Sequence, residues 1–600
     1  MRAFFFTAFF TVYLTPFAQT TIAETNGKWL VENNGEPFPI KGATFGFDAD
    51  TANYDKHFRE LQWMGVNSIR TWGTTSSTPL LLDAAHRHGI KVMLGIWMRH
   101  GRPGMEADDS FDYLTDTAGK TKMYEDALET VEKYKDHPAL LMWGIGNEVY
   151  LNMATDDEKK VYSKLLEKIC KKIQKLDPNH PVASVEAWTF GIKWWEKYVP
   201  SLDVYGINTY GGGASVIDQE LIKLGAKKPY VITEYGVMGE WDIQKDKNGV
   251  VPEPSDQEKF NAIVNGYNDW IKPKLTCLGV YVFHYSDDFT HLSPWLFTHV
   301  DGKKRPQYWA IREAYTGEKP INNVPSIEKF QLTGNDFRGE DWHPVELAVT
   351  DIERDDLRVQ FYYNHREGSR KRRDQILPLH SRGNLSSGFE IKLPKENGGV
   401  KIYAMVADSY DNLGIWTTNI SIKDEDAAEL KFLVPKVELP FEVYKDAGNL
   451  PYTFSGYMGN YDAMEVDFNH SENVHSGETA VKISYSAVDN WFGLGYVDPP
   501  NDWGDMLGGY NIEGAKTFSF WARASRVGVR ANMGFGLIKP DNKFYDTAIK
   551  MKERNISTEW TKFTYDVRDL DLSCIRSGFV IFSNGIGTPF DIYIDDIVFE

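Results

Sequence analysis

Residues 140–149 read LLMWGIGNEV, an apolar run that ends in an amide and a carboxyl side chain. Seven other short apolar runs accompany it, at residues 39–46, 66–73, 90–98, 181–188, 203–211, 229–236 and 277–286. The stretches between them, such as DKHFRELQWMG (55–65), place apolar residues at the three- and four-residue spacing of an amphipathic helix. Eight strand–helix units between residues 39 and 317 predict a closed (β/α)8 TIM barrel.

An open, doubly wound sheet would produce the same alternation of strands and helices. The count of eight units, and the absence of a glycine-rich phosphate turn after the first strand, favour the barrel. Two predicted helix starts carry capping boxes, in which Thr155 precedes Glu158 and Ser255 precedes Glu258.

The pattern changes after Gly317. A chain of 600 residues is too long for one hydrophobic core, and residues 318–329 form a Pro- and Asn-rich linker. Alternating polar and apolar residues then predict an Ig-like β-sandwich over residues 330–423. A second linker, 424–437, precedes a larger β-sandwich, a jelly roll over residues 438–600. The predicted architecture is a (β/α)8 barrel domain over 24–317 followed by two sandwiches.

Bulk composition narrows the functional classes. A formal charge of −19 argues against a nucleic-acid partner, because phosphate binding needs a basic surface. Arg2, the apolar residues 3–18 and candidate cleavage points after Ala18 or Ala23 predict a signal peptide over residues 1–23, and thus a secreted or periplasmic protein. No later segment approaches the ~20 apolar residues of a membrane span. The three cysteines have neither disulfide nor metal-site spacing.

Two strand ends carry the residues suited to glycosidic bond cleavage. Glu148 ends the fourth predicted strand and Glu234, in PYVITEYG, ends the seventh. At the C-terminal face of a barrel these carboxyls would face a substrate from opposite sides. One carboxyl can protonate the leaving oxygen while the other attacks the anomeric carbon or activates water. A lone strand-end glutamate more often binds a loop, but two in such settings predict a catalytic pair.

Residues 39–317 resemble the catalytic domain of glycoside hydrolase clan A, closest to families two and five and to β-1,3-glucan-active relatives. WGIGNEV, ITEYG and SIRTWG carry the resemblance. It implies a retaining enzyme with Glu148 as acid/base and Glu234 as nucleophile. By the same match Asn147 hydrogen-bonds the sugar 2-hydroxyl, Arg70 favours the ionised nucleophile, and Tyr210 hydrogen-bonds it.

The sequence departs from the clan in two respects. The clan commonly has a tryptophan at the end of the eighth strand, where this chain has Phe283 and His284. The sandwich domains that precede the barrel in typical family-two enzymes are also missing, which weakens a simple galactosidase or glucuronidase assignment.

Five tryptophans lie at or beyond predicted strand ends, namely Trp72, Trp97, Trp188, Trp241 and Trp295. Such residues either stack on sugars or anchor loops. Trp97, Trp188 and His284 are predicted substrate contacts.

The last domain resembles galactose-binding-like jelly rolls, a group with many carbohydrate-binding modules, chiefly in its ending DIYIDDIVFE. Trp491, Trp503 and Tyr510 are its candidate sugar contacts. The resemblance also implies a possible structural Ca²⁺ in this domain. Catalysis itself needs no cofactor, and no metal site is expected in the barrel.

We therefore expect a secreted glycoside hydrolase acting on a β-linked polysaccharide or oligosaccharide, with a β-glucan, possibly β-1,3-linked, as first substrate. A transglycosylase would use the same two glutamates and pass the sugar to a carbohydrate acceptor. A non-catalytic glycan-binding protein is the alternative from another class, although the presence of both glutamates, Asn147 and Arg70 argues against it.

Overall fold

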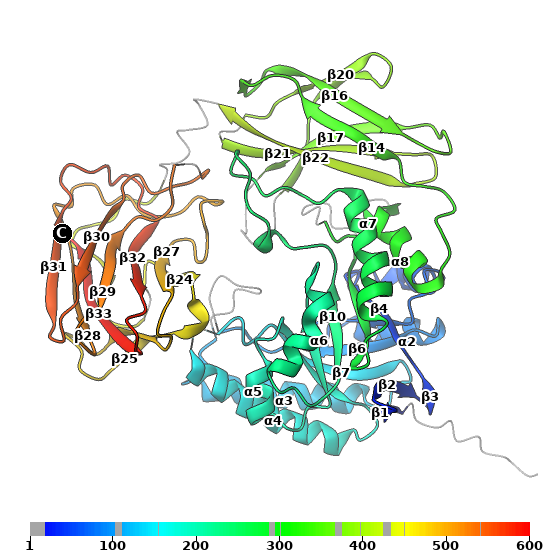
Figure 1. Cartoon of the computed structure of the whole chain (residues 1–600), viewed down its shortest axis with the longest axis horizontal. Coiled ribbons are helices and arrows are strands. Elements are labelled where there is room, and N and C mark those ends of the chain that lie inside the picture. The colour runs from blue at the N-terminus through cyan, green and yellow to red at the C-terminus, as the bar shows by residue number, and fades with distance from the viewer. Residues whose placement is uncertain are drawn as a thin grey trace, which may run out of the picture.

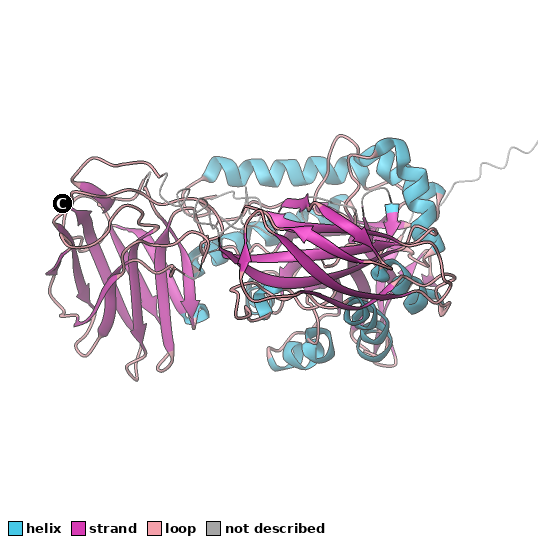
Figure 2. Ribbon diagram, turned by 90° about the horizontal axis from the view of Figure 1, so that it is seen from above, coloured by secondary structure: helices cyan, strands magenta, loops and turns pink. Residues whose placement is uncertain are grey.

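The computed structural model describes residues 19–101, 111–153, 155–286, 294–299, 302–365, 375–395, 398–423, 434–448, 450–540 and 542–600. Most of the signal peptide predicted over residues 1–23 lies outside the described residues, as does much of the linker 424–437. The described chain forms a barrel, a middle sandwich and a C-terminal sandwich (Figure 1). Helices gather around the barrel, whereas the sandwiches consist of strands and loops (Figure 2).

Eight parallel strands close the barrel in the order β10-β11-β4-β5-β6-β7-β8-β9, which confirms the predicted fold. The strands are β4 (Ile40–Phe45), β5 (Ser68–Arg70), β6 (Lys91–Ile96), β7 (Leu140–Asn147), β8 (Val182–Ala187), β9 (Val204–Asn208), β10 (Tyr230–Tyr235) and β11 (Cys277–Tyr285). The helices are α1 (Tyr54–Trp63), α2 (Thr78–Arg87), α3 (Thr117–Tyr134), α4 (Asp156–Leu176), α5 (Ile192–Tyr198), α6 (Gly213–Lys223), α7 (Asp256–Asn265) and α8 (Pro306–Thr316). Every helix follows a strand, so the loops after the strands gather at one face.

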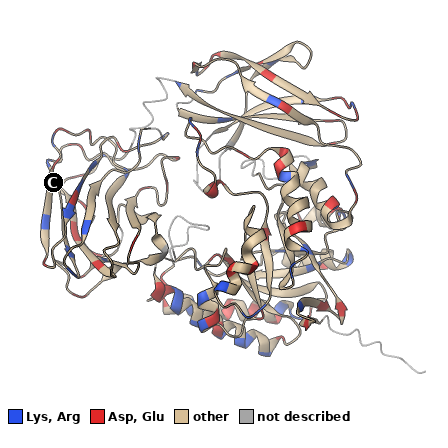
Figure 3. Cartoon of the chain, viewed as in Figure 1, with Lys and Arg blue, Asp and Glu red and all other residues tan. Residues whose placement is uncertain are grey.

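The helices begin and end where their sequences direct. Both predicted capping boxes form, with Thr155 and Ser255 each accepting from the backbone of the glutamate three residues on. Gly317 ends α8 in a left-handed conformation, φ 80°. Acidic and basic residues are interspersed along the outer helices, as expected of a solvated helix layer (Figure 3).

An antiparallel sheet that the sequence pattern did not predict precedes the barrel. It comprises β1 (Thr20–Thr25), β2 (Lys28–Asn33) and β3 (Glu36–Pro37). Val31 is buried with Ile40, Met93 and Leu141 in the core of the barrel interior. The hairpin therefore covers the N-terminal end of the barrel, opposite the face at which the loops after the strands gather. Cleavage after Ala18 would leave β1 whole, whereas cleavage after Ala23 would divide it.

The middle sandwich packs a four-stranded sheet on a five-stranded one. Its first sheet runs β14 (Ser326–Leu332), β16 (Trp342–Thr350), β20 (Gly388–Lys392), β19 (Ser381–Asn384), and its second runs β15 (Phe337–Arg338), β22 (Leu413–Lys423), β21 (Gly398–Ala407), β17 (Arg358–His365), β18 (Gln375–Pro378). The strand β14 begins inside the stretch predicted as linker 318–329, because Ile327, like Phe330 and Leu332, is buried in the core of the middle sandwich.

The C-terminal sandwich also has two sheets. One contains β25 (Met464–His470), β26 (Ala480–Tyr485), β33 (Phe590–Phe599), β28 (Thr517–Ala524) and β31 (Thr561–Asp566), with β23 (Phe441–Tyr444) paired to β33. The other contains β24 (Thr453–Gly459), β27 (Trp491–Val497), β32 (Ser577–Asn584), β29 (Arg530–Phe535) and β30 (Lys550–Asn555). Each sandwich has its own buried core.

Hydrogen bonds join the domains. Trp309 Nε1 of α8 donates to Asn412 Oδ1 of the middle sandwich at 2.8 Å, and Ile415 N donates to Asp256 Oδ2 at 2.7 Å. Lys245, in the loop after β10, donates to Asn542 Oδ1 of the C-terminal sandwich at 3.4 Å. Among the described residues no helix is both long and apolar enough to cross a bilayer.

Candidate active site

Glu234, at the end of β10, is 7% exposed and accepts from three side chains. Arg70 Nη1 and Trp72 Nε1 donate to its Oε1 at 2.9 and 3.0 Å, and the Tyr210 hydroxyl donates to its Oε2 at 2.7 Å. All three partners are donors, and the guanidinium is positively charged, so they match a carboxylate. The structure thus brings Arg70 and Tyr210 onto Glu234, as predicted. Trp72, expected at the rim, serves as a direct donor.

Glu148 directly follows β7 and is half-buried. Its backbone is left-handed, φ 52°, a conformation that costs an ordinary residue ~1–3 kcal/mol and is common at functional sites. The preceding Gly146 also has positive φ, and a Cβ there would lie 2.7 Å from the Tyr162 hydroxyl of α4. Glu148 N donates to Val185 O of β8 at 3.1 Å. This turn directs the Glu148 carboxyl to its place at the mouth.

An amide bridge connects the two glutamates. Arg70 Nη2 donates to Asn147 Oδ1 at 2.7 Å, and Asn208 Nδ2 donates to Asn147 Oδ1 at 3.2 Å and to Glu148 Oε1 at 2.8 Å. Asn208, at the end of β9, is itself held by the Thr233 hydroxyl, which donates to its Oδ1 at 2.8 Å. Sequence reasoning missed Asn208. The sequence feature that could have indicated Asn208 is its position close to Tyr210 at a strand end, in NTYG.

The predicted aromatic contacts lie around this pair. Trp97 and Trp188 are half-buried after β6 and β8, and the Trp97 ring lies 4.9 Å from that of His100. His284, on β11, has its Nδ1 2.9 Å from the Thr44 hydroxyl and its ring 5.5 Å from Trp72. His284 thus abuts the indole that donates to Glu234.

Two tryptophans, Trp241 after β10 and Trp295 after β11, differ in which of the two expected roles they suit, stacking on a sugar or anchoring a loop. Trp295 is buried and donates to Val237 O at 2.8 Å, so it anchors a loop. Trp241 is 51% exposed, stacks on Trp295 at 5.7 Å and contacts the Tyr210 ring at 5.4 Å. Trp241 therefore offers an exposed ring beside Tyr210, and it belongs with the candidate sugar contacts.

The predicted sugar contacts of the C-terminal sandwich lie in different settings. Trp491, on β27, is 48% exposed, and Trp503 is half-buried in the loop between β27 and β28. The Tyr510 ring packs at 5.2 Å from Tyr452, and its hydroxyl donates to Pro451 O at 3.1 Å. Tyr510 is thus engaged in packing, whereas Trp491 presents the most exposed ring of the three.

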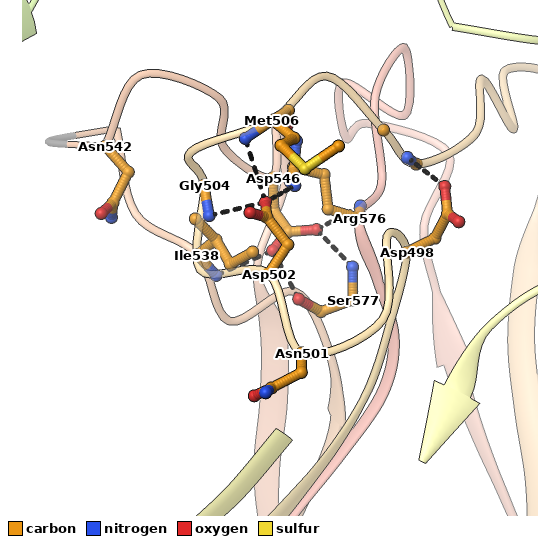
Figure 4. Close-up of polar contacts among 12 residues, drawn as sticks. Asp498, Asn501, Asp502, Gly504, Met506, Ile538, Asn542, Asp546, Arg576 and Ser577 are labelled. Carbon is orange, nitrogen blue, oxygen red and sulfur yellow. Dashed lines mark hydrogen bonds and ion pairs between the residues drawn. The ribbon is translucent and has the colours of Figure 1, made fainter. Parts of the chain in front are cut away.

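A buried polar cluster fixes the loop that carries Trp503 (Figure 4). Asp502 and Arg576 form an ion pair with both side chains fully buried. Asp546 accepts from the backbone N–H groups of Ile538 and Ser577, each at 2.8 Å. Burial raises the pKa of Asp502 despite the guanidinium beside it. Because these groups are enclosed, the cluster shapes the loop and does not face a ligand.

The calcium ion expected in the C-terminal domain would need acidic side chains or backbone carbonyls as ligands. No group of three or more His, Cys, Asp or Glu side chains arranged for a metal occurs within the described residues. The Ca²⁺ site in the C-terminal domain therefore stays a prediction. Cys170, Cys277 and Cys574 are all free and buried.

Comparison with known proteins finds a similarity over the barrel. Residues 34–271 match the family described as "Glycosyl hydrolases family 2, TIM barrel domain". The barrel is therefore similar to the family 2 glycosyl hydrolase barrels. The matched residues include both glutamates, Arg70, Asn147 and Tyr210.

The chain is also similar to curated relatives. The chain is 25% identical to the beta-glucuronidase of Rattus norvegicus over 343 residues, covering 51% of this chain and 49% of that protein. It is 30% identical to the beta-glucuronidase of Pongo abelii over 209 residues, covering 33% and 28%. The chain spans about half the length, or less, of these relatives. A solved beta-glucuronidase from Bacteroides uniformis aligns with 96% of this chain and 67% of its own, with 13% identity and a TM-score of 0.39.

Proposed function

We propose that the protein is a retaining glycoside hydrolase that cleaves β-linked oligosaccharides or polysaccharides. The supporting observation is the continuous network from Glu234 through Arg70, Asn147 and Asn208 to Glu148. It connects two carboxyls at the mouth that differ in burial. Glu234 is buried among donors, whereas Glu148 is half-buried and accepts from the Asn208 amide on Oε1.

These surroundings suit the two roles of double displacement. A Glu234 oxygen attacks the anomeric carbon while Glu148 gives its proton to the departing glycosidic oxygen, which leaves as an alcohol. Arg70, Trp72 and Tyr210 hold Glu234 in place for this attack. Glu148, now a carboxylate, then takes a proton from water as the water oxygen attacks the same carbon. The sugar leaves with retained configuration, and both carboxyls return to their starting states.

The preferred sugar is a neutral β-glucan, with β-1,3-linked chains to be tried first. A glucuronide is the second candidate, favoured by the beta-glucuronidases to which the barrel is similar. A sugar carboxylate needs a cation, and Arg70 at this pair is 2% exposed and already donates to Thr233 O, Glu234 and Asn147. Its commitment to these acceptors favours the neutral sugar.

Export is part of the proposal, because the first residues have the composition of a signal peptide. A secreted enzyme of this kind would act on polysaccharide outside the cell. Transfer to a carbohydrate acceptor uses the same covalent intermediate as hydrolysis, so a transglycosylase differs in the second step alone. A glycan-binding protein without activity is the third possibility.

The test compares wild type with Glu234→Ala on β-glucans, aryl β-glucosides and aryl β-glucuronides, with products separated by chromatography. We expect kcat to fall by about 10⁴-fold or more in the variant, because no nucleophile remains. Added azide should restore turnover of an activated aryl glycoside and give the α-glycosyl azide, since azide enters from the vacated face. Glu240→Ala, an exposed glutamate in the following loop, is the matched control.

Each outcome separates the candidates. Cleavage of glucuronides but not glucosides would overturn the neutral-sugar proposal, and products longer than the substrate would indicate transglycosylation. Binding of a glycan by wild type and variant without cleavage of any substrate would contradict the enzyme assignment.

A further inference from the structure

Glu186 is a fully buried carboxyl that the proposed chemistry does not use. It lies on β8, the strand beside β7, which leads to Glu148. Its neighbour Val185 packs in the barrel interior, so the alternation of a strand places Glu186 on the outer side, toward the helices. A carboxyl buried there without a role would be costly, which makes its partners informative.

The partners of Glu186 are backbone N–H groups of the turn that follows Glu148. Tyr150 N donates to its Oε2 at 2.7 Å, and Leu151 N donates to its Oε1 at 3.3 Å. Ala187 N also donates to Oε1, at 2.9 Å. Residues 149–152 form a turn, so the Glu186 carboxyl acts on that turn as an N-cap side chain acts on a helix.

The same turn fixes the backbone of Glu148. Asn152 N and Nδ2 donate to Glu148 O at 3.2 and 2.7 Å, while Glu148 N donates to Val185 O on β8. The left-handed Glu148 is thus held between β8 on one side and the turn on the other. From this geometry we infer that Glu186 is a positioning residue for the acid/base, an inference that rests on the proposed function.

The charge state of Glu186 agrees with this role. Burial raises the pKa of its carboxyl to about 8, against the lowering effects of its backbone donors and of Lys159. The phenols of Tyr150 and Tyr162 also face it, and burial holds their pKa values well above the usual range. Among the described residues, Glu186 forms no ion pair. A neutral carboxyl can accept these N–H groups without placing a negative charge beneath the acid/base.

The test uses the leaving-group dependence of turnover in Glu186→Ala and Glu186→Gln. A misplaced acid/base slows cleavage of a poor leaving group, which needs protonation, more than cleavage of a dinitrophenyl glycoside, which does not. For Glu186→Ala we expect kcat/KM, which reports the first step alone, to fall about 100-fold on the sugar-linked substrate and less than about fivefold on the dinitrophenyl substrate. Glu186→Gln keeps one acceptor oxygen and should recover part of the loss.

Hydrogen exchange of the amides of residues 149–151 gives a readout independent of activity, and it should quicken in Glu186→Ala. Glu253→Gln removes another buried carboxylate, paired with Lys259 at the middle sandwich, and serves as control. Equal losses on both substrates, or unchanged exchange at the turn, would overturn the role of Glu186. If wild type cleaves no glycoside, the proposed function fails. The exchange measurement still tests the structural part of the inference: faster exchange in Glu186→Ala would show that Glu186 holds the turn, and unchanged exchange would show that it does not.

Discussion

Asn208 donates to both Asn147 and Glu148, so its replacement gives a direct test of the network between the two glutamates. Replacing it with alanine removes the donor to Glu148 and leaves Thr233 without its acceptor. We expect Asn208→Ala to lower kcat about 100-fold, the size of effect seen when a preorganised donor is removed, with little change in KM. Steady-state kinetics on an aryl β-glycoside measure this split.

The comparison for Asn208 is Asn208→Asp, which keeps the shape but turns a donor into a second carboxyl. Repulsion between this carboxyl and Glu148 should make the aspartate variant at least as slow as the alanine variant near neutral pH. If both variants keep wild-type kcat, the bridge between the glutamates has no part in the chemistry.

Glu186 and Glu253 predict opposite pH dependences of stability. Burial raises the pKa of Glu186 in the folded protein from 4.5 to about 8. The contribution of Glu186 to the free energy of unfolding is therefore complete at low pH and is lost as pH rises toward about 8. The folded pKa of Glu253 is lowered: burial opposes this, but Lys259, Lys401 and Arg305 outweigh it. Its contribution is present above its unfolded pKa and is lost in acid.

Thermal unfolding between pH 5 and pH 9 checks this pair. The Tm difference between wild type and Glu186→Gln should shrink from pH 5 to about pH 8 and then level. The difference between wild type and Glu253→Gln should stay flat over that range and shrink in acid. A flat difference for Glu186→Gln would mean that its carboxyl titrates alike in the folded and unfolded chain.

At the scale of single elements, the helix α4 begins with a capping box that follows the active-site turn closely in the chain. Thr155 is buried, and its hydroxyl accepts from Glu158 N at 3.2 Å. In return, Thr155 N donates to the Glu158 carboxyl at 2.9 Å. Thr155→Ala should lower the free energy of unfolding by about 1 kcal/mol. Ser255→Ala, the same cap on α7 but exposed, is its counterpart. Chemical denaturation measures both, and a loss confined to Ser255→Ala would contradict the buried cap.

The elements that sequence predicted are those with a strong local pattern. The barrel strands are continuous apolar runs and the helices are amphipathic, so both could be assigned, as could the capping boxes. The hairpin β1–β2 was not assigned, because TTIAET directly follows the apolar leader and the apolar residues of its partner KWLVEN are adjacent and do not alternate with polar ones. The positions at strand ends and the local motifs were enough to predict the site residues Glu148, Glu234, Arg70 and Tyr210. The parts played by Asn208 and Glu186 could not be predicted, because they depend on the register between neighbouring strands.

At the scale of the whole molecule, the C-terminal sandwich lies beside the loop after β10. Lys245 of that loop contacts Asn542, and Trp241 of the same loop contacts the Tyr210 ring. Sequence composition could separate the domains but could not place them, because the contacts between them join residues far apart in the chain, such as Trp309 and Asn412. It also could not tell the packed Tyr510 from the exposed Trp491.

Trp491 is the site at which glycan binding by the C-terminal sandwich is best tested. Its exposed ring lies on β27, 6.1 Å from Phe582 of the neighbouring strand, and a flat aromatic surface suits the face of a sugar. If the domain binds the polysaccharide, Trp491→Ala should weaken binding to long chains about tenfold, the equivalent of ~1.4 kcal/mol. Cleavage of a short aryl glycoside should be unchanged, because that substrate occupies the barrel site alone.

Affinity electrophoresis in gels containing the polysaccharide measures the binding, and Trp342→Ala supplies the control. Trp342 is likewise an exposed tryptophan on a sheet, 37% accessible, but it belongs to the middle sandwich and is covered by Arg382 at 4.4 Å. Retardation lost with Trp491→Ala and kept with Trp342→Ala would assign binding to the C-terminal sandwich. Equal retardation of wild type and both variants would show that Trp491 takes no part in binding the polysaccharide. Binding would then be assigned to the barrel.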